Sequence, residues 1–243
     1  MGNNICMKES AEFVIEKEVF ASISIGGREI PFITGTTVTM WVVMALILAA
    51  ALILTRKLKA VPGKRQAAVE LFVSFTRNLA DAQIGAHHGR IFAPYLGTML
   101  LFLVVANMVG VFNVIPHSAG FSLHPPTKDF NMTLMLALIS VALTVVAEFR
   151  YKGVKGWLRT FYTPTPVSAF VKVLDYIVRP LSLCLRLFGN ILGATIVMAL
   201  LYGAMPIALP AVFGLYFDLF DAVLQSYVFV FLTSLYLSEA CEE

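Results

Sequence analysis

One arginine inside a long apolar stretch is the residue of this sequence with the clearest chemical potential. Arg186 lies about halfway along an apolar segment at 168–202, with apolar turns on both sides. An arginine keeps its charge at physiological pH, and a charge near the centre of a bilayer is costly, so such residues usually face protein or water and mark an ion path. Arg186 therefore predicts a place where a fixed cation meets an acidic group.

Small and polar residues follow Arg186 at helical spacing. Gly189 and Asn190 lie one turn after the arginine, and Gly193 lies one turn further. A face of small residues lets a second helix approach closely in a membrane, so a carboxylate of a partner helix could reach Arg186. The alternative is that the glycines form a static packing seam and that Arg186 pairs with Asp175, three turns away on the same helix.

The last apolar segment, 211–237, has a polar stripe. Asp218, Asp221 and Gln225 are spaced i, i+3 and i+7, so the three side chains share one helical face. Such a stripe predicts a water-filled funnel that opens outward, with Gln225 deepest and near Arg186. The alternative is that both aspartates are merely solvated at the outer interface.

Two more polar residues lie in other apolar segments. Asn107 either lines the same cavity or only forms a hydrogen bond between helices. Glu148 lies beside Arg150 at the inner interface, where ordinary ion pairing is expected.

The cysteines and histidines show no spacing typical of a metal site. Motifs for phosphate binding (GxxxxGK[ST]), for zinc proteases (HExxH) and for a nucleophile elbow are absent from the sequence. We expect no metal, no cofactor and no nucleic-acid partner, and we expect that the chain alone is not an enzyme.

The composition predicts the elements that must position these residues. The chain has 243 residues, of which 58% are hydrophobic and 14% charged, and its mean hydropathy is +0.81. Several apolar runs approach the roughly 20 residues that a helix needs to cross a bilayer. Because a backbone in lipid must satisfy its own hydrogen bonds, and barrel-type alternation is absent, the spans are helices.

We predict an all-α integral membrane protein with about five transmembrane helices. A tail outside the cytoplasm at 1–36 precedes a single ion-translocating membrane domain at 37–243. An amphipathic surface helix is expected at 64–84, or alternatively a helix packed against the spans. The predicted spans are 37–54, 92–115, 131–149, 168–202 and 211–237, and Asn131 is expected to cap the third.

Basic residues give the orientation. Arg56, Lys57, Lys59, Lys64 and Arg65 follow the first span, and Arg150, Lys152, Lys155 and Arg159 follow the third. Since basic loops stay in the cytoplasm, the N-terminus is expected outside and the C-terminus in the cytoplasm. No cleavable signal peptide is evident in the first 36 residues.

The segment PLSLCLRLFGNILG, Pro180–Gly193, closely resembles the signature of subunit a of F-type ATP synthases. Three further segments are similar to the family: FAPYLGTMLLFLVVANMVGVFNVIP, PPTKDFNMTLMLAL and LQSYVFVFLTSLYLSEACEE. The resemblance covers about Ala93 to the end of the chain. It implies that Arg186 is the essential arginine of the family, that Asn190 is its companion, and that Gln225 faces it.

Of three further positions, one matches a subgroup of the family and two depart from the family pattern. Asp175 matches an acidic position of chloroplast-type relatives. Thr195 stands where many relatives have glutamate, and Asp218 stands where some bacterial relatives have histidine. This pattern is expected if a proton-relaying carboxylate has moved from one helix to its neighbour.

The resemblance also implies a mechanism and partners. The last two helices would be long and tilted around a ring of c subunits, and two offset half-channels would load and unload the ring carboxylates with H⁺ or Na⁺. The other implied partners are the peripheral-stalk b subunits, the remaining ATP synthase subunits and the lipid bilayer, in a bacterial plasma membrane rather than a thylakoid. The competing interpretation is a secondary ion transporter or channel, but no internal repeat supports it. A purely structural scaffold does not explain Arg186.

Overall fold

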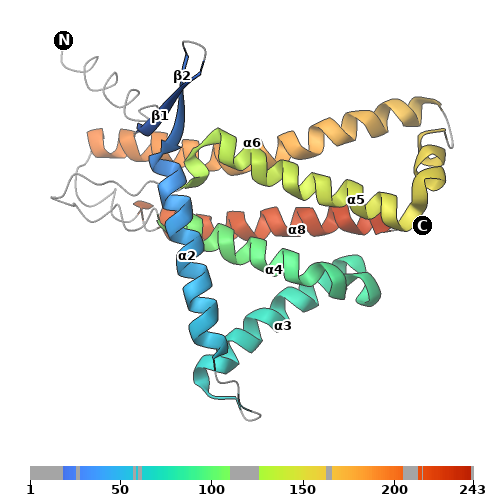
Figure 1. The fold of residues 1–243 in the computed structure, drawn as a ribbon, viewed down its shortest axis with the longest axis horizontal. Coiled ribbons are helices and arrows are strands. Elements are labelled where there is room, and N and C mark those ends of the chain that lie inside the picture. The colour runs from blue at the N-terminus through green and yellow to red at the C-terminus, as the bar shows by residue number, and fades with distance from the viewer. Residues whose placement is uncertain are drawn as a thin grey trace.

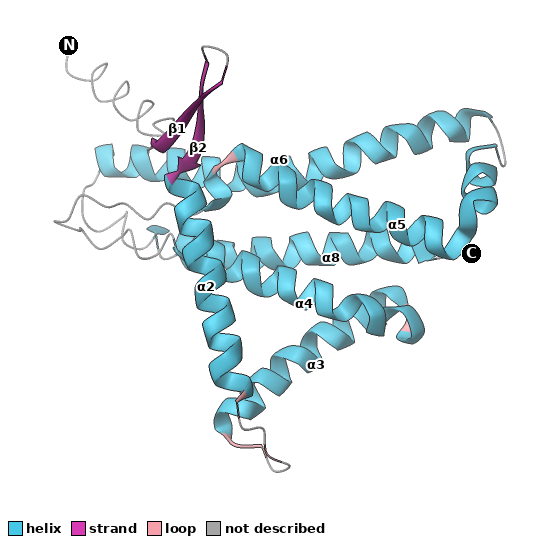
Figure 2. Ribbon diagram, viewed as in Figure 1, coloured by secondary structure: helices cyan, strands magenta, loops and turns pink. Residues whose placement is uncertain are grey.

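Five long apolar helices dominate the fold (Figure 1, Figure 2). The structure, a computed structural model, describes residues 19–25, 28–56, 59, 62–109, 126–162, 166–204, 213–214 and 216–241. Within these residues, the helices long and apolar enough to cross a membrane are Gly35–Thr55, Ala86–Met108, Phe130–Gly153, Val173–Met198 and Leu219–Cys241. The prediction of an α-helical membrane protein with five candidate spans is confirmed.

A β-hairpin precedes the first span. β1 (Val19–Ile25) pairs with β2 (Arg28–Thr34) in antiparallel fashion, and α2 (Gly35–Thr55) follows without a break. Both strands are rich in isoleucine and other residues that favour strands. No element was predicted in this part of the tail, so the hairpin is an addition to the predicted architecture.

The next two helices form an antiparallel hairpin. α3 (Lys64–Ile84) and α4 (Ala86–Met108) are joined by Gly85 alone, whose φ of 90° is in the region that favours glycine. A Cβ added at Gly89 would lie 2.9 Å from the Ala80 carbonyl oxygen, so only glycine permits this close crossing. The turn at Gly85 also explains why α4 begins before the expected start at residue 92.

α3 packs along one face against α4 and α8 (Ala222–Cys241). Its buried residues are Thr76, Ala80 and Ile84, whereas Leu71 is 73% exposed. α3 therefore has one face on the other helices and one face uncovered, which combines the two arrangements considered for 64–84.

α5 (Phe130–Tyr162) follows the short 3₁₀ helix η2 (Pro126–Lys128) and bends at Gly153, where φ is 68°. Asn131 does not cap this helix. Instead, the Asp129 carboxylate oxygen Oδ1 accepts a hydrogen bond from the Asn131 backbone N–H at 3.1 Å. The side chain of the residue just before a helix is the one placed to reach the free N–H groups of the first turn, and Asp129 occupies that position.

The last elements are α6 (Pro166–Ala204), the π-helix η3 (Tyr216–Asp221) and α8. α6 packs mainly on α5, and α8 packs on α4 and α5 (Figure 1). The fully buried side chains at these contacts come from all four helices and include Leu96, Leu103, Ala137, Leu183, Leu187, Phe229 and Leu237. This core fixes where α6 and α8 present their polar residues.

Candidate functional site

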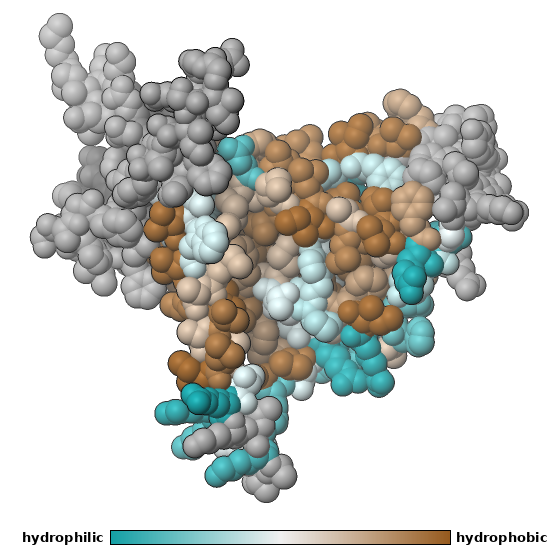
Figure 3. All heavy atoms as spheres, in the orientation of Figure 1, coloured by the Kyte–Doolittle hydropathy of each residue, from teal (hydrophilic) through white to brown (hydrophobic). Residues whose placement is uncertain are grey.

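Arg186 lies at the edge of the exposed side of α6. Its side chain is exposed, and it is close to the middle of the candidate span Val173–Met198. Leu181 and Leu185, one turn before it and next to it, are 45% and 50% exposed. The exposed side of α6 next to the arginine is therefore apolar, and an apolar partner could cover it together with Arg186. Figure 3 shows the apolar surface that extends over α5 and α6.

The same face has open space beside the arginine. A Cβ added at Gly189 or at Gly193 would meet nothing within 4 Å. The two glycines therefore do not form a packing seam with the described parts of the chain, which was one of the alternatives considered. The space they leave lies next to Arg186 and within one or two helical turns of it.

Arg186 does not pair with Asp175. The Asp175 carboxylate oxygen Oδ2 lies 3.9 Å from Nη2 of Arg179, one turn along α6. Among the described residues, none forms a salt bridge with Arg186. An unpaired cation on an uncovered apolar face requires an anionic or polar partner that is not supplied by the described residues of this chain.

The structure brings Asn190 and Asp221 together. Nδ2 of Asn190, one turn after the arginine, donates a hydrogen bond to Oδ2 of Asp221 at the end of η3. Both side chains are partly buried. The contact connects the two apolar segments that the sequence singled out, although the residues are 31 positions apart.

Asn107 of α4 and Gln225 of α8 are both buried, and Gln225 is one turn after Asp221 in the chain. Asn107 donates from Nδ2 to Ser226 Oγ at 3.3 Å and accepts from Thr127 Oγ1 at 2.5 Å. Gln225 is 8% exposed, and its Nε2 has no hydrogen-bond partner among the described residues. Asn107 therefore does connect helices, as one of the two alternatives held, and Gln225 is a buried donor that water or an ion-path group could satisfy.

The other two predicted residues are placed differently. Thr195 is partly buried and donates its hydroxyl to the carbonyl of Ile191 on its own helix, at 2.8 Å. Asp218 belongs to η3, but its side chain lies outside the described part of the structure. Within the described ranges, no group of three or more histidine, cysteine, aspartate or glutamate residues could hold a metal ion.

A polar cluster at the opposite end of α6 was not predicted. Arg179 donates from Nη2 to Oε2 of Glu239 on α8 at 2.5 Å, and its guanidinium lies 4.8 Å from the ring centroid of Tyr236. Lys152 of α5 donates to the Glu239 backbone carbonyl at 3.0 Å. The cluster therefore joins α5, α6 and α8. Arg179 could have been noticed in the sequence as a basic residue in an apolar helix. Its partner Glu239 could not, because it lies 60 positions away.

Glu148 of α5 is buried against a residue of α6 that lies one turn before Arg179. It is 4% exposed and accepts a hydrogen bond from the hydroxyl of Tyr176 on α6. Burial with a tyrosine partner shows that this carboxylate takes part in α5–α6 packing.

Comparisons with known proteins show the family of this chain. The chain matches the family described as ATP synthase A chain over residues 37–238. It is 33% identical over 212 residues to "ATP synthase subunit a, sodium ion specific" of Propionigenium modestum, covering 84% of this chain and 73% of that protein. It is 37% identical over 209 residues to "ATP synthase subunit a" of Gloeobacter violaceus, covering 86% of this chain and 84% of that protein. Because the match includes nearly all of the helical part, the chain belongs to the family of ATP synthase subunit a, multi-pass proteins embedded in the membrane.

Proposed function

We propose that this chain is the stator subunit of a rotary ATP synthase and passes H⁺ or Na⁺ to and from the carboxylates of a rotating ring of c subunits. The observation that supports it best is Arg186, which is exposed near the middle of a candidate span and forms no salt bridge with any described residue. The space left by Gly189 and Gly193 gives a partner helix access to the guanidinium.

The fixed cation makes each ring carboxylate release its ion. A ring carboxylate must be neutral while it faces lipid, and an opposite charge nearby favours its ionised form. As each carboxylate reaches Arg186, it releases its ion before it passes. The same positive charge prevents ions from leaking directly between the two half-channels.

The outer half-channel is lined by the polar residues of α6, η3 and α8. Asn190 and Asp221 support this assignment through their hydrogen bond, and Gln225 supports it through its buried amide nitrogen. Asn107 links α4 to α8 through its hydrogen bond to Ser226. Asp218, Thr195 and Asp221 are the candidates for ion transfer between the outer water and the ring.

The inner half-channel is assigned to the other end of α6. Asp175 supports this assignment, because its side chain is 47% exposed and lies on the N-terminal side of Arg186. The membrane potential can drive ions along such a path, since one elementary charge that crosses 100 mV gains about 2.3 kcal/mol. Several ions can thus contribute to one ATP through rotation.

The partners and the orientation follow from exposed surfaces and charge. The c-ring covers the Arg186 face of α6, and α6 and α8 are tilted around the ring. The uncovered apolar surface of α2 faces lipid and the peripheral-stalk b subunits. Basic residues after the first and third spans support an N-terminus outside and a C-terminus in the cytoplasm, in a bacterial plasma membrane. Nucleotide chemistry is left to the other subunits of the complex.

The test is ATP-driven ion pumping by the reconstituted synthase. Arg186→Ala should abolish pumping while the complex still assembles, because the arginine is exposed and holds no described part of this chain in place. Arg65→Ala, which removes another exposed arginine at the start of α3, is the matched control and should pump normally. Coupled pumping by the Arg186→Ala complex would remove the arginine from the mechanism.

A further inference from the structure

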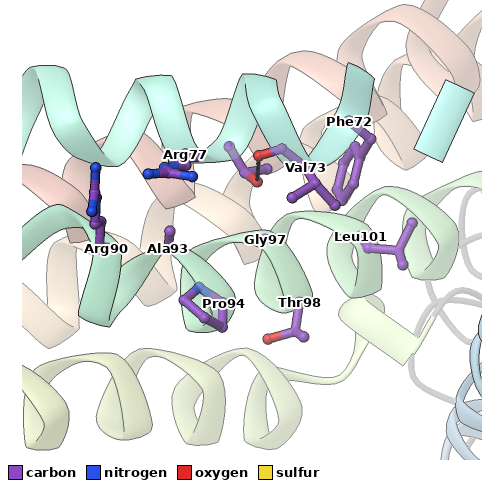
Figure 4. A pocket seen from close by; sticks show the side chains of 10 residues that line it. Phe72, Val73, Arg77, Arg90, Ala93, Pro94, Gly97, Thr98 and Leu101 are labelled. Carbon is purple, nitrogen blue, oxygen red and sulfur yellow. Dashed lines mark hydrogen bonds between the residues drawn. The ribbon is translucent and has the colours of Figure 1, made fainter. Parts of the chain in front are cut away.

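A groove lies between α3 and α4, and none of the residues that line it belongs to the proposed ion path (Figure 4). Its volume is about 640 Å³. Arg77 and Arg90 line one end, and Phe72, Val73 and Leu101 line the other. The groove therefore has one cationic end and one apolar end.

The two ends of the groove lie well apart along α4. Arg90 is in the second turn of α4, close to the Gly85 turn, and Leu101 lies 11 residues further along the same candidate span. At 1.5 Å per residue this separation is about 16 Å, which is close to half of the roughly 30 Å of hydrocarbon. The groove is thus long enough for a headgroup at its cationic end and an acyl chain along the rest of its length.

The charge of the groove fits one anion. Arg77 Nε lies 3.8 Å from Oδ2 of Asp81, and its side chain is 49% exposed. Arg90 is exposed and forms no salt bridge with any described residue. Two arginines and one aspartate leave a net charge of +1 at this end, which a phosphodiester with one negative charge would balance. Figure 3 shows hydrophilic side chains gathered around the α3–α4 turn, as expected at a headgroup level.

We propose that the groove binds one anionic glycerophospholipid. Its phosphodiester contacts the guanidinium groups of Arg77 and Arg90, whose planar donors suit phosphate oxygens. An acyl chain lies along Phe72, Val73 and Leu101, past the small side chains in the middle of the groove, Ala93 and Gly97. The lipid would fill the space between α3 and α4.

The experiment uses the assembled ATP synthase and two photoactivatable probes, phosphatidylglycerol and phosphatidylcholine, with the reactive group midway along one acyl chain. Digestion and mass spectrometry locate the labelled residues. We expect phosphatidylglycerol to label the groove around Val73 and Leu101, and phosphatidylcholine to label it several-fold less. Arg77→Gln and Arg90→Gln should each lower labelling about fivefold, since a basic residue near anionic lipid has about that effect.

Two variants serve as controls. Arg65→Gln removes a cation of α3 outside the groove and should leave labelling unchanged. Ala93→Phe keeps both arginines but narrows the apolar path, and it should also reduce labelling. If the arginine variants fail to assemble, the comparison of the two lipids in the unaltered complex still decides. Equal labelling by both lipids, or a protein segment of another subunit cross-linked to Leu101, would overturn the proposal.

Discussion

Asn190 of α6 and Asp221 of η3 form a hydrogen bond in which the amide donates to the carboxylate. Asp221 is the last residue of a π-helix, a geometry that is frequent at functional sites. The extra residue per turn rotates the side chains of η3 relative to those of α8. The contact therefore depends on a local distortion as well as on the order of residues in the sequence.

We expect Asn190 and Asp221 to act as one unit in ion conduction. Asn190→Ala and Asp221→Ala should each slow passive ion flow through the membrane sector, and the double variant should be little slower than the slower single variant. Residues in one hydrogen-bond network show coupling energies of about 0.5–3 kcal/mol, whereas separate sites are additive. The measurement is the rate of ion flow into vesicles under an imposed potential.

The matched control for this pair is Thr195→Ala. Thr195 hydrogen-bonds only within α6 among the contacts described, so its effect should multiply with that of Asp221→Ala. Multiplicative effects for Asn190 and Asp221 as well would show that their hydrogen bond has no role in conduction.

The sequence predicted the parts of the fold that depend on local composition. Hydropathy located the five spans because each has a long apolar run. The position of Arg186 could be predicted because a charge in an apolar helix stands out without knowledge of its neighbours. The family motif around it is equally local.

Contacts between distant residues could not be predicted in the same way. Arg179 and Glu239 are 60 positions apart, and which partner an arginine chooses depends on how α6 and α8 pack. Asn131 and Asp129 are both good capping residues, so the boundary of α5 decided between them. The β-hairpin at 19–34 is a single pair of seven-residue strands, and composition alone does not separate such a pair from a tail.

Asp218 is the residue that we expect to transfer ions at the outer end. Asp218→Asn should slow passive ion flow strongly, by about a hundredfold if the carboxylate acts as a general acid and base. Asp218→Glu keeps the titrating group and should restore most of the flow. If Asp218→Asn conducts normally, the role passes to Asp221 or Asp175.

A bulky residue at Gly189 tests whether a partner occupies the space beside Arg186. The described chain has room for a side chain there, so Gly189→Leu should leave the subunit folded and inserted in the membrane. If a ring helix packs on this face, the same change should block rotation and ATP-driven pumping. Pumping and the amount of inserted subunit are measured on the same membranes.

Gly63 provides the control for this substitution. An added Cβ at Gly63 also meets nothing within 4 Å, and Gly63 lies at the start of α3, away from α6. Gly63→Leu should therefore leave pumping intact. Normal pumping by Gly189→Leu would show that no helix passes close to this part of α6.

The Arg179–Glu239 pair should stabilise the end of α8 against α6. Arg179 is 18% exposed and Glu239 is 49% exposed, so the pair lies between a surface pair, worth about 0.2–1 kcal/mol, and a buried pair, whose disruption costs about 3–5 kcal/mol. We expect Arg179→Ala to cost about 1–2 kcal/mol on this scale, measured as a lower thermal unfolding temperature of the purified subunit.

Asp175→Asn is the control for this prediction. Asp175 is the other carboxylate beside Arg179, but it lies 3.9 Å away and is 47% exposed, so their interaction is weak. It should shift the unfolding temperature little. The exchanged pair Arg179→Glu with Glu239→Arg should recover part of the stability lost by either single change, and no recovery would mean that packing on Tyr236, rather than the ion pair, holds Arg179 in place.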